Sequence, residues 1–295
     1  MDAADLKTVE AVARHGSMNK AAAELNTVQS NVTARIRALE DELGVALFQR
    51  HARGVVITPA GQRVLPFADR MAKLVADARQ AALDDGEPNG TLVLGSLETT
   101  MALRLSPILT RYSKTYPDVQ LVVSSGTTAG LLRDVIASRL DGAFVAGPVV
   151  HPDLLQETAF KEELVLVTAP SISSLRDLVN VGDLRTVVFQ SGCSYRQRLE
   201  SYLGGRGIIV ARSLEFGSLD AILSCVGAGV GITLLPEGVV AEAARAGQVT
   251  LHRLPQAVAK VQTLFIRRRD GYPSSAMTAF LAMSRDLHRR AALVA

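Results

Sequence analysis

Apolar residues recur at every third or fourth position through most of the first 83 residues of the chain. A first helix is expected around Leu6 and Val9, and a short second helix follows Ser17, whose hydroxyl can cap it. The clearest pattern predicts a third helix that is capped by Thr27 and ends near Leu43. Its expected buried stripe consists of Val28, Val32, Ile36, Leu39 and Leu43. The sequence therefore predicts a small helical domain at this end of the chain.

The pattern changes after the third helix. Residues 46–58, "ALFQRHARGVVIT", form two short β-prone segments around a turn, which is typical of a hairpin. Thr58 followed by Pro59 is a strong start signal for a helix that runs to about Leu83. Its apolar stripe comprises Val64, Ala68, Met71, Val75, Ala78 and Ala82. This stripe needs a partner, either a second copy of the helix or another part of the same chain.

Residues 84–90, "DDGEPNG", have the composition of a linker. Beyond them, apolar strand-like runs alternate with helix-like segments, which predicts an α/β region with parallel strands. The pattern is compatible with one large sheet or with two smaller lobes. A last helix is expected from about Ser274 to Ala292.

The front of the third helix carries amides and hydroxyls where better helix formers would be expected. A short helix, a turn and a second helix form a helix-turn-helix by pattern, although any pair of packed helices would look similar. Gln, Asn, Ser and Thr side chains can bond to base edges, and arginines further along can bond to phosphates. The candidate DNA-binding residues are Ser17, Asn19, Lys20, Gln29, Ser30, Asn31, Thr33, Arg35, Arg37, Arg50 and Arg53.

Three hydroxyl-rich segments, residues 95–101, 124–130 and 190–200, each follow an expected strand and open an expected helix. Such junctions of parallel strands meet at one edge of a sheet, where ligands of α/β proteins bind. Their hydroxyls and backbone amides favour a small anionic or polar metabolite. Cys193 lies at one helix start, where the pKa of a thiol can be lowered. The glycines of residues 227–232 instead follow a helix and open a strand, so they do not form a dinucleotide-binding loop.

Composition narrows the class of protein. The net charge is +3, and residues 1–90 hold 11 Lys and Arg against 12 Asp and Glu, so any DNA-binding face must come from local placement. The longest apolar runs are far shorter than the roughly 18 residues of a membrane span, and the N-terminus lacks the apolar segment of a signal peptide. Cys193 and Cys225, 32 positions apart, fit a reducing cytoplasm. The histidines, at 15, 51, 151, 252 and 288, have no metal-binding spacing, and no cofactor is expected.

Residues 16–65, "GSMNKAAAELNTVQSNVTARIRALEDELGVALFQRHARGVVITPAGQRVL", resemble the N-terminal domain of LysR-type transcriptional regulators. The positions that carry the resemblance are Ser17, Ala22, Ala23, Leu25, Leu39, Glu40, Leu43, Gly44, Leu47, Phe48, Arg50, Thr58, Ala60 and Gly61. The variants "TVQSNVTARIRALE" and "GCSYR" are similar to the branch that includes glutamate-biosynthesis and related regulators. Peroxide-sensing members carry a closely spaced cysteine pair, which this chain lacks.

The resemblance implies an α/β protein with an N-terminal winged helix-turn-helix, a long linker helix and a two-lobed effector domain like periplasmic binding proteins of type 2. The expected limits are 1–58 for the winged helix-turn-helix, 59–83 for the linker and dimerisation helix, 84–90 for the hinge and 91–295 for the effector domain. Lobe I would hold 91–161 and 264–295, and lobe II 162–263. The effector would bind between the lobes at positions matching Ser96, Glu98, Thr99, Thr100, Gly126, Thr127, Thr128, Ser191, Gly192, Cys193, Ser194 and Phe216.

The family further implies a cytoplasmic regulator, an activator or a repressor, that binds double-stranded promoter DNA and a small-molecule effector. It also implies a homotetramer built as a dimer of dimers, and leaves room for a contact with RNA polymerase. The rival interpretation is a solute-binding or enzymatic α/β protein with a helical oligomerisation domain. An enzyme should show a nucleophile with its base or a metal cluster, and the sequence indicates neither, so no catalytic residue is assigned.

Overall fold

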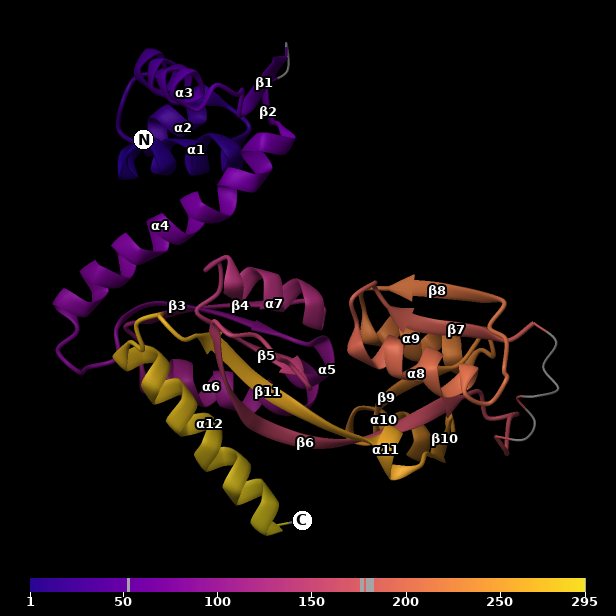
Figure 1. The fold of residues 1–295 in the computed structure, drawn as a ribbon. Coiled ribbons are helices and arrows are strands. Elements are labelled where there is room, and N and C mark those ends of the chain that lie inside the picture. The colour runs from indigo at the N-terminus through magenta and orange to yellow at the C-terminus, as the bar shows by residue number, and fades with distance from the viewer. Residues whose placement is uncertain (52–53, 176–177, 179–182, 295) are drawn as a thin grey trace. The chain divides into compact units, whose positions relative to one another are not determined.

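The computed structural model describes residues 1–51, 54–175, 178 and 183–294, with side chains up to residue 287. The chain forms two compact units, Met1–Asp85 with Ala137–Arg139, and Gly86–Ile136 with Leu140–Ala295 (Figure 1). Within the described residues, no helix combines the length and the apolar character that crossing a membrane requires.

The first unit is helical apart from one hairpin. Its elements are α1 (Ala3–His15), α2 (Met18–Glu24), α3 (Gln29–Leu43), β1 (Phe48–His51), β2 (Gly54–Ile57) and α4 (Pro59–Leu83). Asp2 and Asp5 form a capping box at the start of α1, and Gly16 ends that helix with a left-handed φ of 58°. Ser17 caps α2, as expected, by accepting a hydrogen bond from the Lys20 N–H.

Helix α3 differs from its expected form at both ends. Its N-cap is Val28, which has no side-chain capping bond, so the expected role of Thr27 is wrong. The Thr27 hydroxyl instead accepts a hydrogen bond from the Asn31 amide, at 3.1 Å. The inner members of the expected stripe, Val32, Ile36 and Leu39, are buried, whereas the outer members, Val28 and Leu43, are 59% and 39% exposed. The helix thus packs along its middle, while its first residues lie at the surface.

The hairpin and α4 complete the first unit. Strands β1 and β2 pair antiparallel, with Phe48 opposite Ile57. Thr58 caps α4 by accepting from the Gly61 N–H, and a Cβ at Gly61 would lie 2.3 Å from the Leu47 carbonyl oxygen, so only glycine fits there. Helix α4 packs against α1. Of its expected stripe, Ala68 is buried and Val64 and Met71 are half-buried, whereas Val75, Ala78 and Ala82 are exposed.

The second unit is an α/β structure. Its elements are β3 (Gly90–Ser96), α5 (Glu98–Thr100), the π-helical turn η1 (Met101–Leu105), α6 (Ser106–Thr115), β4 (Val119–Ser125), α7 (Thr128–Ile136), β5 (Gly142–Ala146), β6 (Leu154–Thr168), β7 (Arg185–Phe189), α8 (Ser194–Gly204), β8 (Arg212–Phe216), α9 (Leu219–Gly227), β9 (Thr233–Pro236), α10 (Glu237–Arg245), β10 (Thr250–Arg253), α11 (Gln256–Ala259), β11 (Lys260–Arg268) and α12 (Ser275–Val294). As expected, the glycines of 227–231 end a helix and precede a strand.

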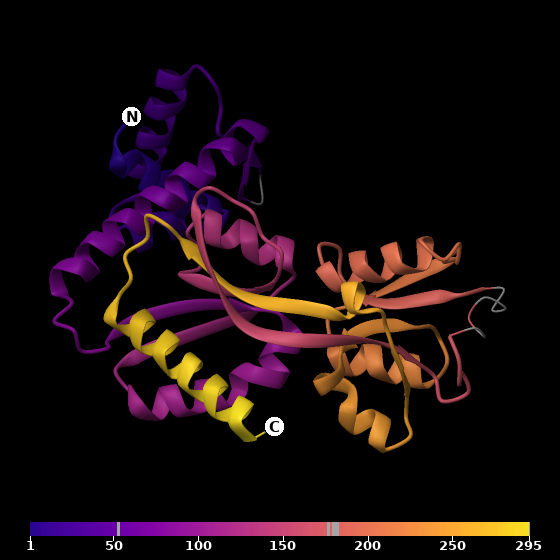
Figure 2. The ribbon, with the colours of Figure 1, turned by 60° about the horizontal axis from the view of Figure 1, so that its bottom comes forward.

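The unit has two lobes that share two long strands. The hydrogen-bonded order is β10-β6-β11-β5-β3-β4, with β9 also paired to β6. Strands β6 and β11 run antiparallel through both lobes, and β3 is parallel to β4 and to β5 (Figure 2). Strands β7 and β8 form a separate parallel pair in the second lobe. Between the alternatives of one large sheet and two lobes, the chain therefore adopts two lobes on a shared, curled sheet.

The two crossing strands, β6 and β11, contain the residues at which the chain was expected to pass between lobes, and these limits stay a prediction. Residues 161 and 162 fall inside β6, and the pairing of β11 with β6 shifts register between Thr263 and Leu264. Aromatic side chains fill one face of the first lobe, where Phe144 packs against Phe160, Phe265 and Phe280. A second core of buried aliphatic residues continues from the other face of this lobe into the second one. The strand ends between the lobes are thereby held by packed cores on both sides.

Candidate nucleic-acid interface and ligand cavity

The exposed front of α3 combines polar side chains with one unpaired arginine. Ser30 and Arg37, seven positions apart, share the face opposite the buried stripe. Arg37 forms no ion pair or hydrogen bond with any described residue. Gln29 donates a hydrogen bond to the Thr33 hydroxyl at 3.0 Å, which orients the amide along the helix surface. This face can present amide, hydroxyl and guanidinium groups to another molecule together.

Two other candidates on α3 face the start of α1. The Arg35 guanidinium bonds to Asp5 at 3.1 Å and to Asp2 at 3.4 Å. Asn31 bonds to Thr27 and, with Arg35, lines a surface concavity next to the first residues of α1. The charge of Arg35 is therefore compensated by two carboxylates, and a phosphate would have to compete with them.

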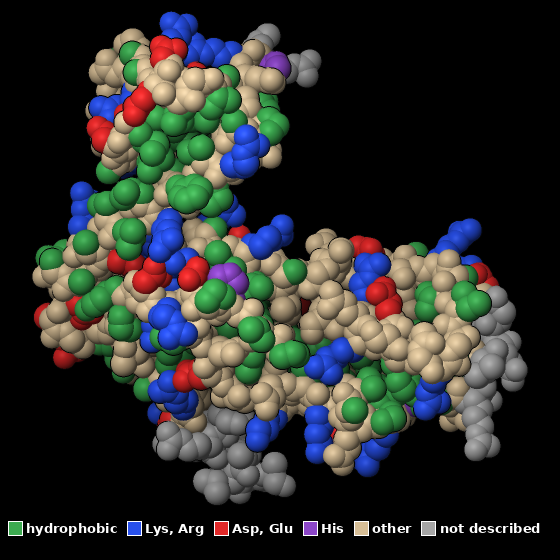
Figure 3. Space-filling view, in the orientation of Figure 1, with side chains coloured by type: hydrophobic (Ala, Val, Ile, Leu, Met, Phe, Trp, Pro, Cys, Tyr) green, Lys and Arg blue, Asp and Glu red, His purple; other side chains and the backbone are tan. Residues whose placement is uncertain are grey.

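The remaining candidates of the first unit lie outside α3. Asn19 and Lys20 are exposed on α2, and Arg50 is exposed on β1. Arg53 lies outside the described residues. Figure 3 shows basic and acidic side chains together over α3, in agreement with the nearly balanced charge of this unit.

Glu40 is a positioning residue to which sequence analysis gave no role beyond its match to the family pattern. Its Oε1 accepts hydrogen bonds from the N–H groups of Leu47 at 2.7 Å and Phe48 at 2.9 Å. These two bonds fix the start of β1 to α3, and with it the hairpin that carries Arg50. The sequence around Glu40 does not predict this contact. The partners of Glu40 are backbone N–H groups, which every residue except proline carries.

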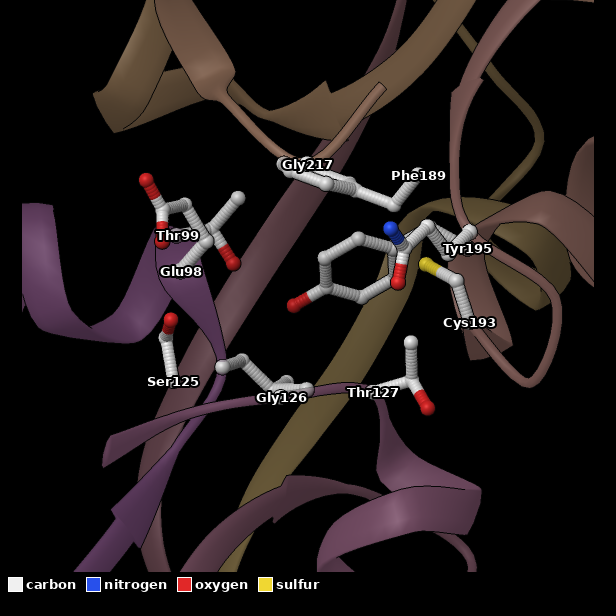
Figure 4. A pocket seen from close by; sticks show the side chains of 11 residues that line it. Glu98, Thr99, Ser125, Gly126, Thr127, Phe189, Cys193, Tyr195 and Gly217 are labelled. Atoms are coloured by element: carbon white, nitrogen blue, oxygen red, sulfur yellow. The ribbon is translucent and has the colours of Figure 1, made fainter. Parts of the chain in front are cut away.

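The second unit contains a cavity between its lobes, of about 110 Å³. It lies where β3 and β4 end in the first lobe and where β7 ends and α8 begins in the second (Figure 4). The lining residues are Leu97, Glu98, Thr99, Ser125, Gly126, Thr127, Phe189, Gln190, Cys193, Tyr195 and Gly217. The three hydroxyl-rich junctions of the sequence thus converge on one space.

The structure brings some of the predicted effector residues to this cavity and leaves others outside it. Glu98, Thr99, Gly126, Thr127 and Cys193 line it. The residues that do not line it are Ser96, Thr100, Thr128, Ser191, Gly192, Ser194 and Phe216. Ser96 is buried and donates to the Leu97 carbonyl, and the Thr128 hydroxyl accepts from the Ala146 N–H. These hydroxyls serve the local fold.

Six lining residues were missed by sequence analysis, namely Leu97, Ser125, Phe189, Gln190, Tyr195 and Gly217. Leu97, Ser125 and Gln190 lie within the three junctions, and Phe189 directly precedes the third, so only Phe189 needed a wider window. Gly217 follows β8, whose end could be placed beside β7 only after their parallel pairing was known. Tyr195 was inside a junction but was read as part of a helix.

Two buried hydroxyls of the cavity lack partners. Tyr195 is 4% exposed and Thr99 is 2% exposed, and neither side-chain oxygen has a hydrogen-bond partner among the described residues. The two hydroxyls lie close to each other, and Thr99 lowers the pKa of Tyr195 in opposition to burial. Burial raises the pKa of Tyr195 to about 12, so its hydroxyl keeps its proton at neutral pH. Figure 4 shows both groups directed into the cavity, with Glu98 at its edge.

Backbone amides at the junctions are mostly engaged. Ala129 donates to the Gly192 carbonyl at 3.3 Å, a contact that joins the two lobes beside the cavity. The Gly130 N–H bonds to the Thr127 hydroxyl. Gly192 has a φ of 92°, and a Cβ there would lie 3.0 Å from the Ala129 Cβ, so this contact requires glycine.

Cys193 differs from its sequence-based expectation. Burial raises the pKa of its thiol, which outweighs the opposing effect of the N–H groups of Tyr195 and Arg196. The expectation of a lowered pKa is therefore wrong, because the thiol is enclosed in the aliphatic core that joins the lobes. Both cysteines are free.

Comparison with known proteins gives two family matches that together span most of the chain. Residues 3–62 match the bacterial regulatory helix-turn-helix protein model of the lysR family, and residues 85–289 match the LysR substrate binding domain. The HTH-type transcriptional regulator GltR of Bacillus subtilis (strain 168) is 40% identical over 274 residues, which cover 93% of each chain. The HTH-type transcriptional regulator CzcR of Bacillus cereus is 40% identical over 288 residues, which cover 98% of each chain.

Solved structures agree with these matches. A full-length OxyR variant from Pseudomonas aeruginosa has the same fold, with a TM-score of 0.73 at 19% identity, covering 97% of this chain and 95% of that one. Full-length CbnR in complex with its target DNA has a TM-score of 0.63 at 25% identity, covering 98% and 99%. The similar proteins named here are transcriptional regulators, and this disfavours the rival interpretation as an enzyme.

Proposed function

We propose how this protein works from one premise: the chain belongs to the LysR family of transcriptional regulators. It is a DNA-binding regulator with a helix-turn-helix domain and a substrate-binding domain. We propose that the front of α3 reads base edges and that exposed arginines hold the DNA backbone. The observation that carries this assignment is the exposed, polar front of a helix whose middle is buried in its own domain.

The role of each side chain follows from its hydrogen-bonding groups and from the bonds that it already forms within the protein. Gln29, Ser30 and Thr33 have groups that suit base edges, and Asn31 can join them by exchanging its bond to Thr27. Arg37 and Arg50 are exposed and suit phosphates. Arg35 contributes less, because binding a phosphate would cost it its two carboxylate partners. Ser17, Asn19 and Lys20 would contact the backbone next to the groove.

A binding experiment on the upstream DNA of the protein's own gene tests these roles. Arg50→Ala should weaken binding to all sequences alike and lower the slope of log affinity against log salt by about 1. Gln29→Ala should instead relax discrimination at one base pair by about 1–3 kcal/mol. Arg212→Ala, which removes an exposed arginine from the second unit, should change neither quantity.

Two results would contradict the assignment. Unchanged site preference in Gln29→Ala would remove its base-reading role. Absence of saturable, sequence-specific binding by the wild-type protein at low salt would favour the solute-binding alternative.

We further propose that a small-molecule effector binds in the cavity between the lobes. Support comes from the convergence of lining residues from both lobes and from the two buried hydroxyls without partners among the described residues. A ligand there would shift the protein between arrangements only if it binds one of them more tightly than the other. Thermal unfolding of the full chain in the presence of candidate metabolites tests this, because a ligand of the native state raises the midpoint.

The assembly belongs to the same proposal. Helix α4 leaves large apolar side chains exposed, with Phe67 at 68% and Leu74 at 46%. We propose that these residues form a dimer contact with a second copy of α4, and that such dimers pair into a tetramer in the cytoplasm. A contact with RNA polymerase would follow where the bound promoter brings the two together.

A further inference from the structure

The charge of the cavity wall distinguishes between the two ligand classes that the sequence favoured, a small anionic or a small polar metabolite. Among the described residues, Glu98 is its only charged lining residue, and no lysine, arginine or histidine takes part. Glu98 is half-buried at the edge of the space, and its carboxylate forms no hydrogen bond or ion pair with any described residue. An anionic ligand would therefore meet an uncompensated negative charge, which disfavours its binding.

Three arginines near the cavity are directed to other partners, whereas Arg133, exposed on α7 with its guanidinium near Gly130, forms no ion pair or hydrogen bond with a described residue. On α8, Arg196 pairs with Glu200 and Glu215, and Arg198 donates to the Gly147 carbonyl. Arg104, beside the first lobe's junction, forms a two-point ion pair with Glu162. Arg104, Arg196 and Arg198 are therefore not free to neutralise Glu98 or to hold a carboxylate in the cavity.

Several backbone amides at the junctions are engaged within the fold. Ala129, Gly130 and Cys193 donate to Gly192, Thr127 and Gln190, respectively. The next two N–H groups, those of Tyr195 and Arg196, face the Cys193 sulfur. An anion would have to break these bonds in order to bind these five N–H groups.

Two buried hydroxyls and one carboxylate are the groups best placed to bind a ligand. The Tyr195 and Thr99 hydroxyls can each donate and accept, and a ligand would supply the partners that the described residues do not. Leu97 and Phe189 give the wall an apolar part. The cavity of about 110 Å³ is smaller than the space of about 150 Å³ that accepts benzene in an engineered protein, so it suits a small ligand.

We propose that the effector is a small amine that is protonated at neutral pH. Its ammonium group binds Glu98 at the edge of the cavity, and a hydroxyl or carbonyl group of the same molecule binds Tyr195 and Thr99. This inference rests on the proposed function of the cavity as the effector site and specifies the chemical class of the ligand.

Three probes of matched size test the charge of the ligand: 1-amino-2-propanol, propane-1,2-diol and lactate. Calorimetry on the full-length protein at pH 7 gives the affinity of each probe, for the wild type, Glu98→Gln and Tyr195→Phe. Gln keeps the size and hydrogen-bonding capacity of Glu98 but removes its charge. Thermal unfolding of each unliganded variant checks that it folds.

The wild type should prefer the amine to the diol and the diol to lactate. Glu98→Gln should lose about tenfold to a hundredfold of its affinity for the amine, keep its affinity for the diol and gain affinity for lactate. Tyr195→Phe should weaken both the amine and the diol, since they share the buried hydroxyl contact.

Other results separate the inference from the function it rests on. Lactate could bind more tightly than the amine, with Tyr195→Phe weakening the binding of lactate. The cavity would then be the ligand site, but its ligand would be an anion and the inference would be wrong. If no probe binds the wild type at millimolar concentration, the inference is also wrong. If the amine binds equally to all three proteins, its site lies elsewhere, and the cavity loses its proposed role.

Discussion

At the scale of single residues, two buried tyrosines show how similar burial can have opposite consequences. Tyr112 is fully buried, and its hydroxyl donates to the Ala276 carbonyl at 2.7 Å. Tyr195 is almost as buried, yet its hydroxyl has no partner among the described residues. The first hydroxyl contributes to the fold, whereas the second is buried at a cost in stability, and we propose that a ligand supplies its partner.

Matched substitutions of the two tyrosines should separate these roles. Tyr112→Phe removes a buried hydrogen bond and leaves a carbonyl unpaired, so the free energy of unfolding should fall by about 1–3 kcal/mol. Tyr195→Phe removes an unpaired polar group, so the unliganded protein should be equally or more stable. Urea unfolding of the full-length variants measures this free energy for the transition of the second unit. A loss in Tyr195→Phe as large as in Tyr112→Phe would mean that Tyr195 has a structural partner after all.

At the scale of elements, α3 depends on its neighbours for the position of the hairpin. Glu40 accepts two backbone hydrogen bonds from the residues that open β1. Thr58 adds a second connection by donating its hydroxyl to the Ala46 carbonyl at 2.8 Å. These side chain to backbone bonds determine where Arg50 lies relative to the front of α3.

Substitution of Glu40 should loosen the hairpin without unfolding α3. In Glu40→Ala, the Leu47 and Phe48 amides lose their acceptor, so hydrogen exchange over residues 44–58 should accelerate by about tenfold or more. Glu40→Gln retains an acceptor oxygen and should stay close to the wild type, as should Asp41→Ala, which replaces an exposed neighbour. Unchanged exchange in Glu40→Ala would show that the two bonds do not hold the hairpin.

At the scale of the whole molecule, each unit has one feature that suggests a binding partner. The first unit has an exposed apolar helix face at Phe67 and Leu74. The second unit has two cores joined by long strands and a cavity between its lobes whose buried hydroxyls lack partners among the described residues. In the proposed function, a second copy of the chain covers the apolar face and a small ligand occupies the cavity.

A charge on the exposed face of α4 should disrupt the proposed dimer. Leu74→Glu should shift the protein toward a monomer in light scattering, because a carboxylate would be buried without a partner in the contact. Ala76→Glu adds the same charge to an exposed position on another face of the helix and should leave the assembly unchanged. An unchanged assembly in Leu74→Glu would mean that other surfaces hold the copies together.

The order and type of elements were largely determined by the sequence. The stripe around Val32, Ile36 and Leu39, the Thr58 cap and the Gly44 stop act over a few residues, so local patterns were enough to predict α3 and α4. Local patterns failed at Val28 and Thr27, because the burial of a helix end depends on what packs against it.

The site was decided by the tertiary structure. Sequence patterns identified three junctions that converge on one cavity, but they could not show that Ser96 and Thr128 bond within the fold, nor that Tyr195 lacks a partner among the described residues. The sequence also suggested that the backbone amides around Cys193 could bind an anion. In the structure the Cys193 N–H donates to the Gln190 carbonyl, and the Cys193 thiol is buried. Helical periodicity is a short-range property of the chain, whereas burial, pairing and net charge at a site depend on residues that only folding brings together.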